Sequence, residues 1–503
     1  MQFQKNFIDF FPGDQSSKNH QRMTPESAYC LSSLNKFNNL KLLHFSDNCN
    51  ELFQAPLQAK QLIEYINNPS QDCYASNYGG HQFGHWAGQL GDGRAHYLGE
   101  LCSNPKLNLE VQLKGSGLTP YSRRGDGNAV LRSSLREHLA SEALHHLGVS
   151  TTRSLALMST GNTVIRDPEY NGQYKEESGA LVCRVAPSFL RFGHLEMAHF
   201  NNQLEIKNAY FKWLIDNYYP DCKNKEELLH AICIKTAELF VHWMRIGFTH
   251  GVLNTDNMSL LGLSIDYGPF SFLDEYDPLF TPNTTDLPGR RYAFGRQASI
   301  GLWNLQKVAQ CFELSESQMK DAFESYQNHF TQGYLKMWAN KMGLQTISDK
   351  SIVFIEAFLK DFKIDYTLFF STLEDWLKSN FELSQESQIN QLQSISYLKN
   401  WNAKQLQATS EFIKSIKSLY DNEDNQSAIK LMTTTNPKFI LRNYLLYEAI
   451  EEYEKEKSLK KLNTLYDLSQ NPYQKDSNQL RFYQKKPEWA NNLFGAALLS
   501  CSS

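Results

Sequence analysis

The sequence predicts an α+β fold of two lobes, followed by a mainly helical C-terminal region. Between residues 75 and 195 the hydrophobic patterns combine several strands with one helix, which is the layout of a small α/β lobe. From about residue 300 onwards the patterns are largely helical. The chain has 503 residues, which exceeds the usual size of one compact core. We therefore divide it into a leader of unclear role (1–74), a first lobe (75–195), the main part of a second lobe (196–300) and a helical region (301–503).

The first lobe begins with a glycine-rich segment and a strand. Residues 75–95 contain six glycines, a density that lets the backbone approach a ligand closely. Residues 107–114 alternate between apolar and polar side chains, as in a strand with one apolar face. Lys114 lies on the other face of this strand, with Gln112 and Glu110.

One helix and three strands complete this lobe. Leucine or alanine recurs at every fourth position from Leu131 to Leu147, and Gly148 follows, so we expect a helix over 130–147 that stops at this glycine. Short apolar segments then predict strands over 154–159, 162–167 and 179–186.

The second lobe is organised around one long helix. Residues 227–247 are mostly apolar and end in glycine, which predicts a helix with a glycine stop. The loop 248–257 follows, and the apolar run 259–266 predicts a short strand directly before Tyr-Gly-Pro-Phe.

Composition narrows the class of protein. The formal charge of −4 argues against a dedicated nucleic-acid binder. The sequence contains no run of about 18 apolar residues, so we predict no membrane span. The N-terminus resembles neither a signal peptide nor an Arg-rich presequence. The nine cysteines include no CxxC pair, which favours neither a zinc site nor a disulfide framework. We expect a reduced, cytoplasmic protein that binds neither nucleic acid nor membranes.

Two charged residues of the first lobe match a nucleotide-binding arrangement. Lys114 ends a strand and Glu137 lies on the following helix, as do the lysine and glutamate that form an ion pair in protein kinases. A lysine at a strand end is more often a solvated surface residue, so this pair gains weight only together with other motifs.

The loop after the long helix supplies those motifs. A kinase catalytic loop reads His-x-Asp-x-x-x-x-Asn, and Asp-Phe-Gly follows after the next strand. Here His250 and Asn257 stand at the matching positions, and Asp266-Tyr267-Gly268 is a close variant of the metal-binding tripeptide. Val252 occupies the position of the kinase base and cannot accept a proton, so Asp256 is the nearest carboxylate that could replace it.

Purely structural roles of these residues remain an alternative. Asn and Asp in such loops also make Asx-turns. The joint order of the four motif residues, each in the expected element, nevertheless favours a catalytic site. These residues are Lys114, Glu137, Asn257 and Asp266. Arg184 and Arg191 flank Ala-Pro-Ser-Phe-Leu and suit phosphate oxygens. For Arg123 and Arg124, in a glycine-rich turn, we favour surface ion pairs.

The histidines of the glycine-rich segment do not predict a metal site. His81 and His85 are four residues apart, but Gly84 between them argues against a helix that would align them. His145 and His146 point to different faces of the expected helix, and no matching set of ligands is evident.

These motifs together resemble the selenoprotein-O family, also called YdiU-like protein adenylyltransferases. The resemblance runs from about Ala75 to Leu305 and is most specific in five long stretches: 77–95, 113–127, 135–155, 184–196 and 250–278. The terminal Cys-Ser-Ser is also similar to that family, in which some members carry selenocysteine where this chain has Cys501.

The resemblance implies a protein-kinase-like, two-lobed fold that binds ATP in a flipped orientation. It implies transfer of AMP from ATP to Ser, Thr or Tyr hydroxyls of proteins, with release of pyrophosphate. Residues 75–195 would then carry the nucleotide-binding motifs, and 196–300 would be the catalytic part of the C-lobe. Asp256 would act as the base, Glu137 would pair with Lys114, and Asn257 and Asp266 would hold Mg²⁺ or Mn²⁺. The residues expected to contact ATP are Gly91, Gly93, Arg94, Lys114, Asp126, Gly127, Arg184, Arg191 and Asp266.

Two other functions fit parts of the pattern. The valine at the base position counts against a true protein kinase, and the retained metal-binding motifs count against an inactive ATP-binding scaffold. Cys501 leaves two readings open: a redox switch that ties down the chain end, or a tail thiol without function.

Overall fold

A central sheet organises the first half of the molecule. The computed structural model describes residues 2–37, 39–69, 72–105, 107–168 and 171–500. Within them, nine strands form one sheet whose neighbours are antiparallel, except for the parallel pair β1 and β2. The order along the sheet is β1 (Gly13–Asp14), β2 (Tyr29–Ser32), β4 (Cys73–Ser76), β7 (Ala95–Asn104), β8 (Leu107–Lys114), β11 (Lys175–Ala186), β10 (Arg153–Arg166) and β3 (Lys41–Phe45), and β9 (Ala129–Val130) pairs with β11.

The described part of residues 1–74 belongs to this sheet and its core. It supplies β1, β2 and β3 as well as the short helices α1 (Asn6–Phe10), α2 (Asp47–Asn50) and α3 (Ala59–Asn67). Phe3 and Leu62 are buried in one apolar cluster with Leu109 and Leu181 of the sheet. The segment is therefore an integral part of the α/β lobe.

The elements predicted around Lys114 are confirmed. The strand predicted over 107–114 is β8, and the predicted helix is α4 (Leu131–His146), with Leu135 and Leu139 buried. The strands predicted over 154–159 and 162–167 are instead one strand, β10, with a register shift between Ser159 and Thr163. Gly161 adopts φ +72° there, so a bulge carries the strand through a segment that reads as a break.

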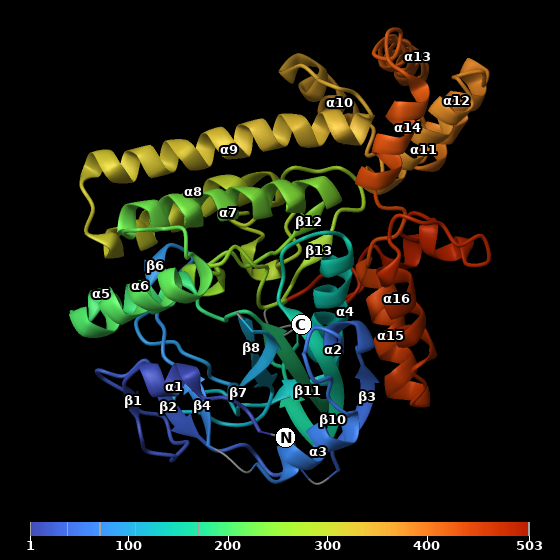
Figure 1. Ribbon diagram of the computed structural model, residues 1–503. Coiled ribbons are helices and arrows are strands. Elements are labelled where there is room, and N and C mark those ends of the chain that lie inside the picture. The colour runs from blue at the N-terminus through green and yellow to red at the C-terminus, as the bar shows by residue number, and fades with distance from the viewer. Residues whose placement is uncertain (1, 38, 70–71, 106, 169–170, 501–503) are drawn as a thin grey trace.

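Several helices that follow β11 in the chain lie along one side of the sheet (Figure 1). They include α5 (Phe192–Phe200), α6 (Leu204–Tyr218), α7 (Lys225–Ile246), α8 (Gln297–Ala309) and α9 (Glu316–Met342). The helix predicted over 227–247 is α7, capped by Asn224 and closed by Gly247 at φ +70°. Figure 1 shows α7 and α9 side by side, in accordance with their mutual packing.

The strand predicted over 259–266 does not form. This segment makes only isolated bridges, Arg191 with Ser259 and Thr151 with Ser264, and Gly262 turns the chain at φ +67° against Lys235. The pairing strands are β12 (Phe248–Thr249) and β13 (Ser271–Phe272). A turn at Gly262 therefore interrupts the apolar run that predicted a strand.

The C-terminal region is helical, as predicted. It contains α10 (Asp349–Asp361), α11 (Tyr366–Lys378), α12 (Gln385–Ser394), α13 (Ala403–Ser418), α14 (Asn425–Thr435), α15 (Asn443–Glu456) and α16 (Lys460–Gln470). Helices α10 to α14 contribute to a separate apolar cluster around Trp338 and Trp376. Helices α15 and α16 return to the first lobe and pack against α4.

Short 3₁₀ turns complete the secondary structure: Thr255–Asn257, Thr284–Asp286, Phe294–Arg296, Gln310–Phe312, Leu480–Tyr483 and Glu488–Ala490. No helix in the described part of the chain is long and apolar enough to cross a bilayer. The eight cysteines in that part are free thiols, and Cys501, with both readings of it, lies outside the described residues.

Candidate active site

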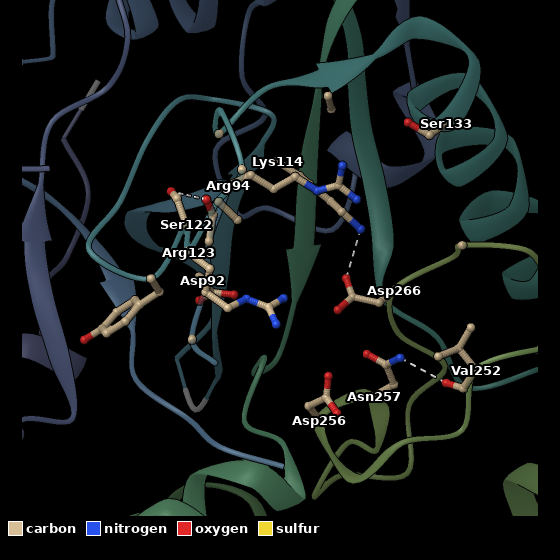
Figure 2. A pocket seen from close by; sticks show the side chains of 18 of the residues that line it. Asp92, Arg94, Lys114, Ser122, Arg123, Ser133, Val252, Asp256, Asn257 and Asp266 are labelled. Atoms are coloured by element: carbon tan, nitrogen blue, oxygen red, sulfur yellow. Dashed lines mark hydrogen bonds and ion pairs between the residues drawn. The ribbon is translucent and has the colours of Figure 1, made fainter. Parts of the chain in front are cut away.

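A cavity of about 1230 Å³ brings the motif residues together. Its lining comes from separate parts of the chain: the 91–95 turn, the end of β8, the 121–129 loop, α4, β11 and the loop 252–269. Figure 2 shows Lys114 above Asp266, with Asp256 and Asn257 below it on the second-lobe loop. All the residues that the sequence predicts for ATP, metal and base therefore line one cavity.

The carboxylate of Asp266 lies among three cations. The Lys114 ammonium lies 3.0 Å from Asp266 Oδ1 and 2.7 Å from Glu137 Oε2. Arg184 reaches the same two acids, at 2.5 Å from Asp266 and 3.0 Å from Glu137. Arg191 pairs with Asp266 Oδ2. Strand β8, helix α4 and strand β11 thus converge on the tripeptide Asp266-Tyr267-Gly268.

The electrostatics of this cluster keep Asp266 ionised. Burial alone would raise its pKa, but Arg191, Lys114 and Arg184 outweigh that effect and hold the pKa of Asp266 well below its ordinary value. Burial likewise opposes the charge of Arg184, and Asp266 and Glu137 nevertheless raise the pKa of Arg184. Arg184 and Arg191 are therefore buried cations whose N–H groups can donate to the oxygens of an anionic ligand in place of a carboxylate.

Asn257 is held by the residue that occupies the kinase base position. Its side-chain nitrogen donates to the carbonyl oxygen of Val252 at 2.9 Å. Within the described residues its amide oxygen receives no hydrogen bond. His250 lies buried behind this loop, with Nε2 2.8 Å from the carbonyl oxygen of Ile265. The loop thus offers an amide oxygen to the cavity that Asp266 also lines.

Asp256 is the carboxylate of this loop with properties of a base. It is 8% exposed, and burial raises its pKa to about 6. Gln82 donates to its Oδ2 at 3.1 Å, while the Arg191 guanidinium donates to its backbone oxygen at 2.8 Å. Oδ1 has no hydrogen-bond partner within the described part of the chain. A buried carboxylate with this pKa can accept a proton near neutral pH.

Glycines bring the backbone of two loops close to the cavity. A Cβ on Gly91 would come 2.3 Å from the ring of Tyr121, and one on Gly93 would come 2.8 Å from the Tyr121 carbonyl oxygen. Gly127 has φ +74°, and a Cβ there would lie 2.2 Å from the carbonyl carbon of Gly117. A larger residue at any of these positions would require its neighbours to move.

The rim of the cavity carries exposed charges. Asp126 pairs with Arg166 at 2.8 Å, and Arg94 is exposed. The prediction of surface ion pairs for Arg123 and Arg124 is wrong. Within the described residues neither guanidinium has an acidic partner, and both residues line the cavity. The turn 121–127 directs them toward the ligand space instead of toward neighbouring acids.

The histidine pair of the glycine-rich segment lies beside the cavity on a small hairpin. His81 Nδ1 lies 2.7 Å from Glu196 Oε1, whereas His85 is exposed. In the described part of the chain, no group of three or more His, Cys, Asp and Glu side chains could hold a metal ion.

Sequence reasoning missed three side chains of the site. Asp92 is buried and accepts hydrogen bonds from Ser76. Gln112 accepts one from Arg184, and Gln82 contacts Asp256. The alternation of β8 places Gln112 on the face of Lys114, which is a usable signal. The contact of Gln82 with a residue 174 positions away has no signal in a single sequence.

Comparisons with known proteins identify the family to which the chain is similar. Residues 18–470 match the family described as "Protein adenylyltransferase SelO". The chain is 43% identical over 517 residues to "Protein nucleotidyltransferase YdiU" of Cytophaga hutchinsonii, covering 100% of this chain and 99% of the relative. It is 38% identical over 524 residues to the protein of the same name from Flavobacterium johnsoniae, with the same coverage. A third relative with this name, from Azoarcus, is 41% identical and covers 86% of this chain and 84% of its own length.

Proposed function

The chain belongs to the SelO/YdiU family of protein nucleotidyltransferases, and from this premise we propose that it transfers AMP from ATP to Ser, Thr or Tyr hydroxyls of proteins. The observation that carries the proposal is the pairing of two features in one cavity. The half-buried Lys114 and the buried Arg184 and Arg191 surround Asp266. Val252 replaces the kinase base, and Asp256 lies on the same loop.

The cations are the proposed triphosphate site. Lys114, Arg184 and Arg191 have N–H donors within ion-pair distance of one carboxylate, so phosphate oxygens entering the cavity would meet donors that are already oriented. Gly91, Gly93 and Gly127 support a close approach of the backbone to the nucleotide. Arg94 and Asp126 at the rim complete the proposed ATP contacts.

The oxygen donors of the second-lobe loop fit Mg²⁺ or Mn²⁺. Mg²⁺ in nucleotide sites takes one or two protein ligands and fills its shell with phosphate oxygens and water. Asp266 offers an ionised carboxylate, and Asn257 offers an amide oxygen that receives no hydrogen bond within the described residues. When bound, the cation would neutralise charge on the phosphate oxygens.

In the proposed reaction, the oxygen of a protein hydroxyl attacks the α-phosphorus of ATP. Its proton passes to the Asp256 carboxylate. The bond between the α-phosphorus and the oxygen that links it to the β-phosphorus breaks. Pyrophosphate leaves with the electron pair of that bond, and AMP stays on the acceptor. The raised pKa of Asp256 places this base near the pH of the cell.

We further propose that the two halves correspond to a protein-kinase-like arrangement, with residues 75–195 as the N-lobe and 196–300 as the catalytic part of the C-lobe. The Lys114–Glu137 ion pair of 2.7 Å, between a strand and the following helix, supports this assignment. The position of the Asp266 tripeptide beside that pair supports it as well.

Labelled ATP tests the proposed function. We would incubate the protein and Mg²⁺ with casein, an unfolded polypeptide rich in hydroxyl side chains, and with ATP labelled at either the α- or the γ-phosphate. The proposal requires that only the α-label enters protein. Entry of the γ-label alone would identify a kinase, and binding of ATP without entry of either label would identify an inactive scaffold.

A further inference from the structure

A small hairpin borders the cavity next to Asp256. It consists of β5 (His81–Gln82) and β6 (His85–Trp86), with Gln82 paired to His85, so Phe83 and Gly84 form a two-residue loop. Both loop residues have positive φ, +50° and +92°. Such loops favour Asn, Asp or Gly at the first position, and a bulky side chain there is strained. The hairpin therefore keeps a phenylalanine where local conformation disfavours one.

Hydrogen bonds fix this hairpin to the loop of Asp256. The backbone N–H of His81 donates to Thr255 Oγ1 at 2.7 Å, and the side-chain amide of Gln82 donates to Asp256 Oδ2 at 3.1 Å. The backbone N–H of Phe83 donates to Asn254 Oδ1 at 3.2 Å. Three successive hairpin residues thus contact three successive loop residues.

The two segments approach so closely at Gly80 that no side chain fits there without a shift of its neighbours. A Cβ on Gly80 would lie 2.8 Å from Asp256 Cβ and 2.9 Å from its Oδ1. Gly80 limits the carboxylate on one side and the Gln82 amide holds its other oxygen. The rotamer of Asp256 is therefore set by the hairpin.

The ring of Phe83 is exposed at the cavity. Its exposed fraction is 39%, and both Gln82 and Phe83 line the cavity together with Asp256. The ring packs on one side against Tyr292, with centroids 5.3 Å apart. A strained, exposed aromatic side chain beside a reactive carboxylate is typical of a binding contact.

We infer that the β5–β6 hairpin orients the acceptor: Gln82 positions the Asp256 carboxylate, and Phe83 binds an apolar side chain beside the acceptor hydroxyl of the protein substrate. This inference rests on the proposed function. Gln82 acts through Asp256 and is a positioning residue, whereas Phe83 contacts the substrate.

The two roles predict effects on different kinetic parameters, kcat for Gln82 and KM for Phe83. Gln82→Met keeps the length of the side chain but removes the N–H donor, so kcat should fall about tenfold or more while the affinity for ATP and the KM for casein change less than about twofold. Gln82→Glu places a second carboxylate against Asp256 and should be slower still. Phe83→Ala should raise the KM for casein about tenfold with kcat almost unchanged.

Phe200→Ala is the matched control for Phe83. The Phe200 side chain is 42% exposed and packs against Trp86 of the same hairpin, with centroids 4.4 Å apart, but it does not line the cavity. This variant should keep the wild-type KM and kcat. Melting temperatures identify any variant that loses its fold. In that case Gln82→Glu replaces Gln82→Met, and Phe83→Leu replaces Phe83→Ala.

The outcomes separate the inference from the function on which it rests. If the wild-type protein transfers no α-label to casein or to folded proteins, the proposed function fails. If Phe83→Ala keeps the wild-type KM, or Gln82→Met keeps the wild-type kcat, the role of the hairpin is overturned even though transfer occurs.

Discussion

At the scale of single residues, the site depends on one carboxylate in an unusual position. Asp266 has φ +61°, a conformation that few non-glycine residues adopt. Its charge is balanced by Lys114, Arg184 and Arg191. These contacts distinguish Asp266 from an ordinary turn residue and support the proposed metal site.

Asp266→Asn should separate metal binding from nucleotide binding. The substitution keeps the shape but removes the negative charge, so metal-dependent transfer should fall at least about a hundredfold, since electrostatic stabilisation of the reacting phosphate is lost. Metal-free binding of ATP should stay equal or become tighter, because the three cations lose their competing partner. Titration calorimetry with and without Mg²⁺ measures both effects. Wild-type transfer by a folded variant would contradict the assignment.

Lys114→Met should weaken ATP binding. A charged hydrogen bond contributes about 1.5–3 kcal/mol, which corresponds to a rise of roughly 10- to 100-fold in the dissociation constant. Arg132→Met is a suitable control, because Arg132 pairs with Glu177 on the same lobe and does not line the cavity. An unchanged ATP affinity of Lys114→Met would contradict a role of Lys114 in ATP binding.

At the scale of elements, regular periodicity was predictable and glycine-dependent turns were not. Strand β8 and helices α4 and α7 follow patterns that local side-chain spacing specifies. The bulge at Gly161 and the turn at Gly262 depend on what packs against each glycine, which a single sequence does not reveal. The same holds for the site: the motifs predicted Lys114 and Asp266, whereas the contact of Gln82 needs the folded hairpin.

Gly127→Ala should distort the 117–128 loop. The new Cβ would overlap the backbone of Gly117, and the left-handed backbone adds strain of about 1–3 kcal/mol. We expect a lower melting temperature and weaker ATP binding. Gly289→Ala is the control, since its Cβ would meet nothing within 4 Å. Equal effects of the two substitutions would exclude a special role for the loop backbone.

At the scale of the whole molecule, a contact between the half-buried His44 and the buried His138 joins distant segments. His138 on α4 lies 2.9 Å from His44 on β3 and 2.7 Å from Ser154 on β10. Tyr466 of α16 packs on the ring of His44, with centroids 4.2 Å apart. The C-terminal helices thus support α4, which carries Glu137 of the site.

This histidine contact predicts acid sensitivity. Burial lowers the pKa of His44 to about 4 and that of His138 to about 3. Below about pH 6.5 the unfolded chain binds protons that the folded chain excludes, so each histidine lowers the free energy of unfolding by up to roughly 1.4 kcal/mol per pH unit. Denaturant midpoints at pH 7.5 and 5.0 measure this loss, and His138→Gln should make it smaller. A variant as acid-sensitive as the wild type would contradict the assignment.

The most direct test of the central claim is the chemical identity of the group added to an acceptor. Intact-mass spectrometry of casein after reaction with ATP and Mg²⁺, together with quantification of the released product, provides it. We predict the addition of AMP, matched one to one by pyrophosphate and lost in Asp256→Asn. Addition of phosphate with release of ADP, or unchanged AMP transfer by Asp256→Asn, would contradict the account.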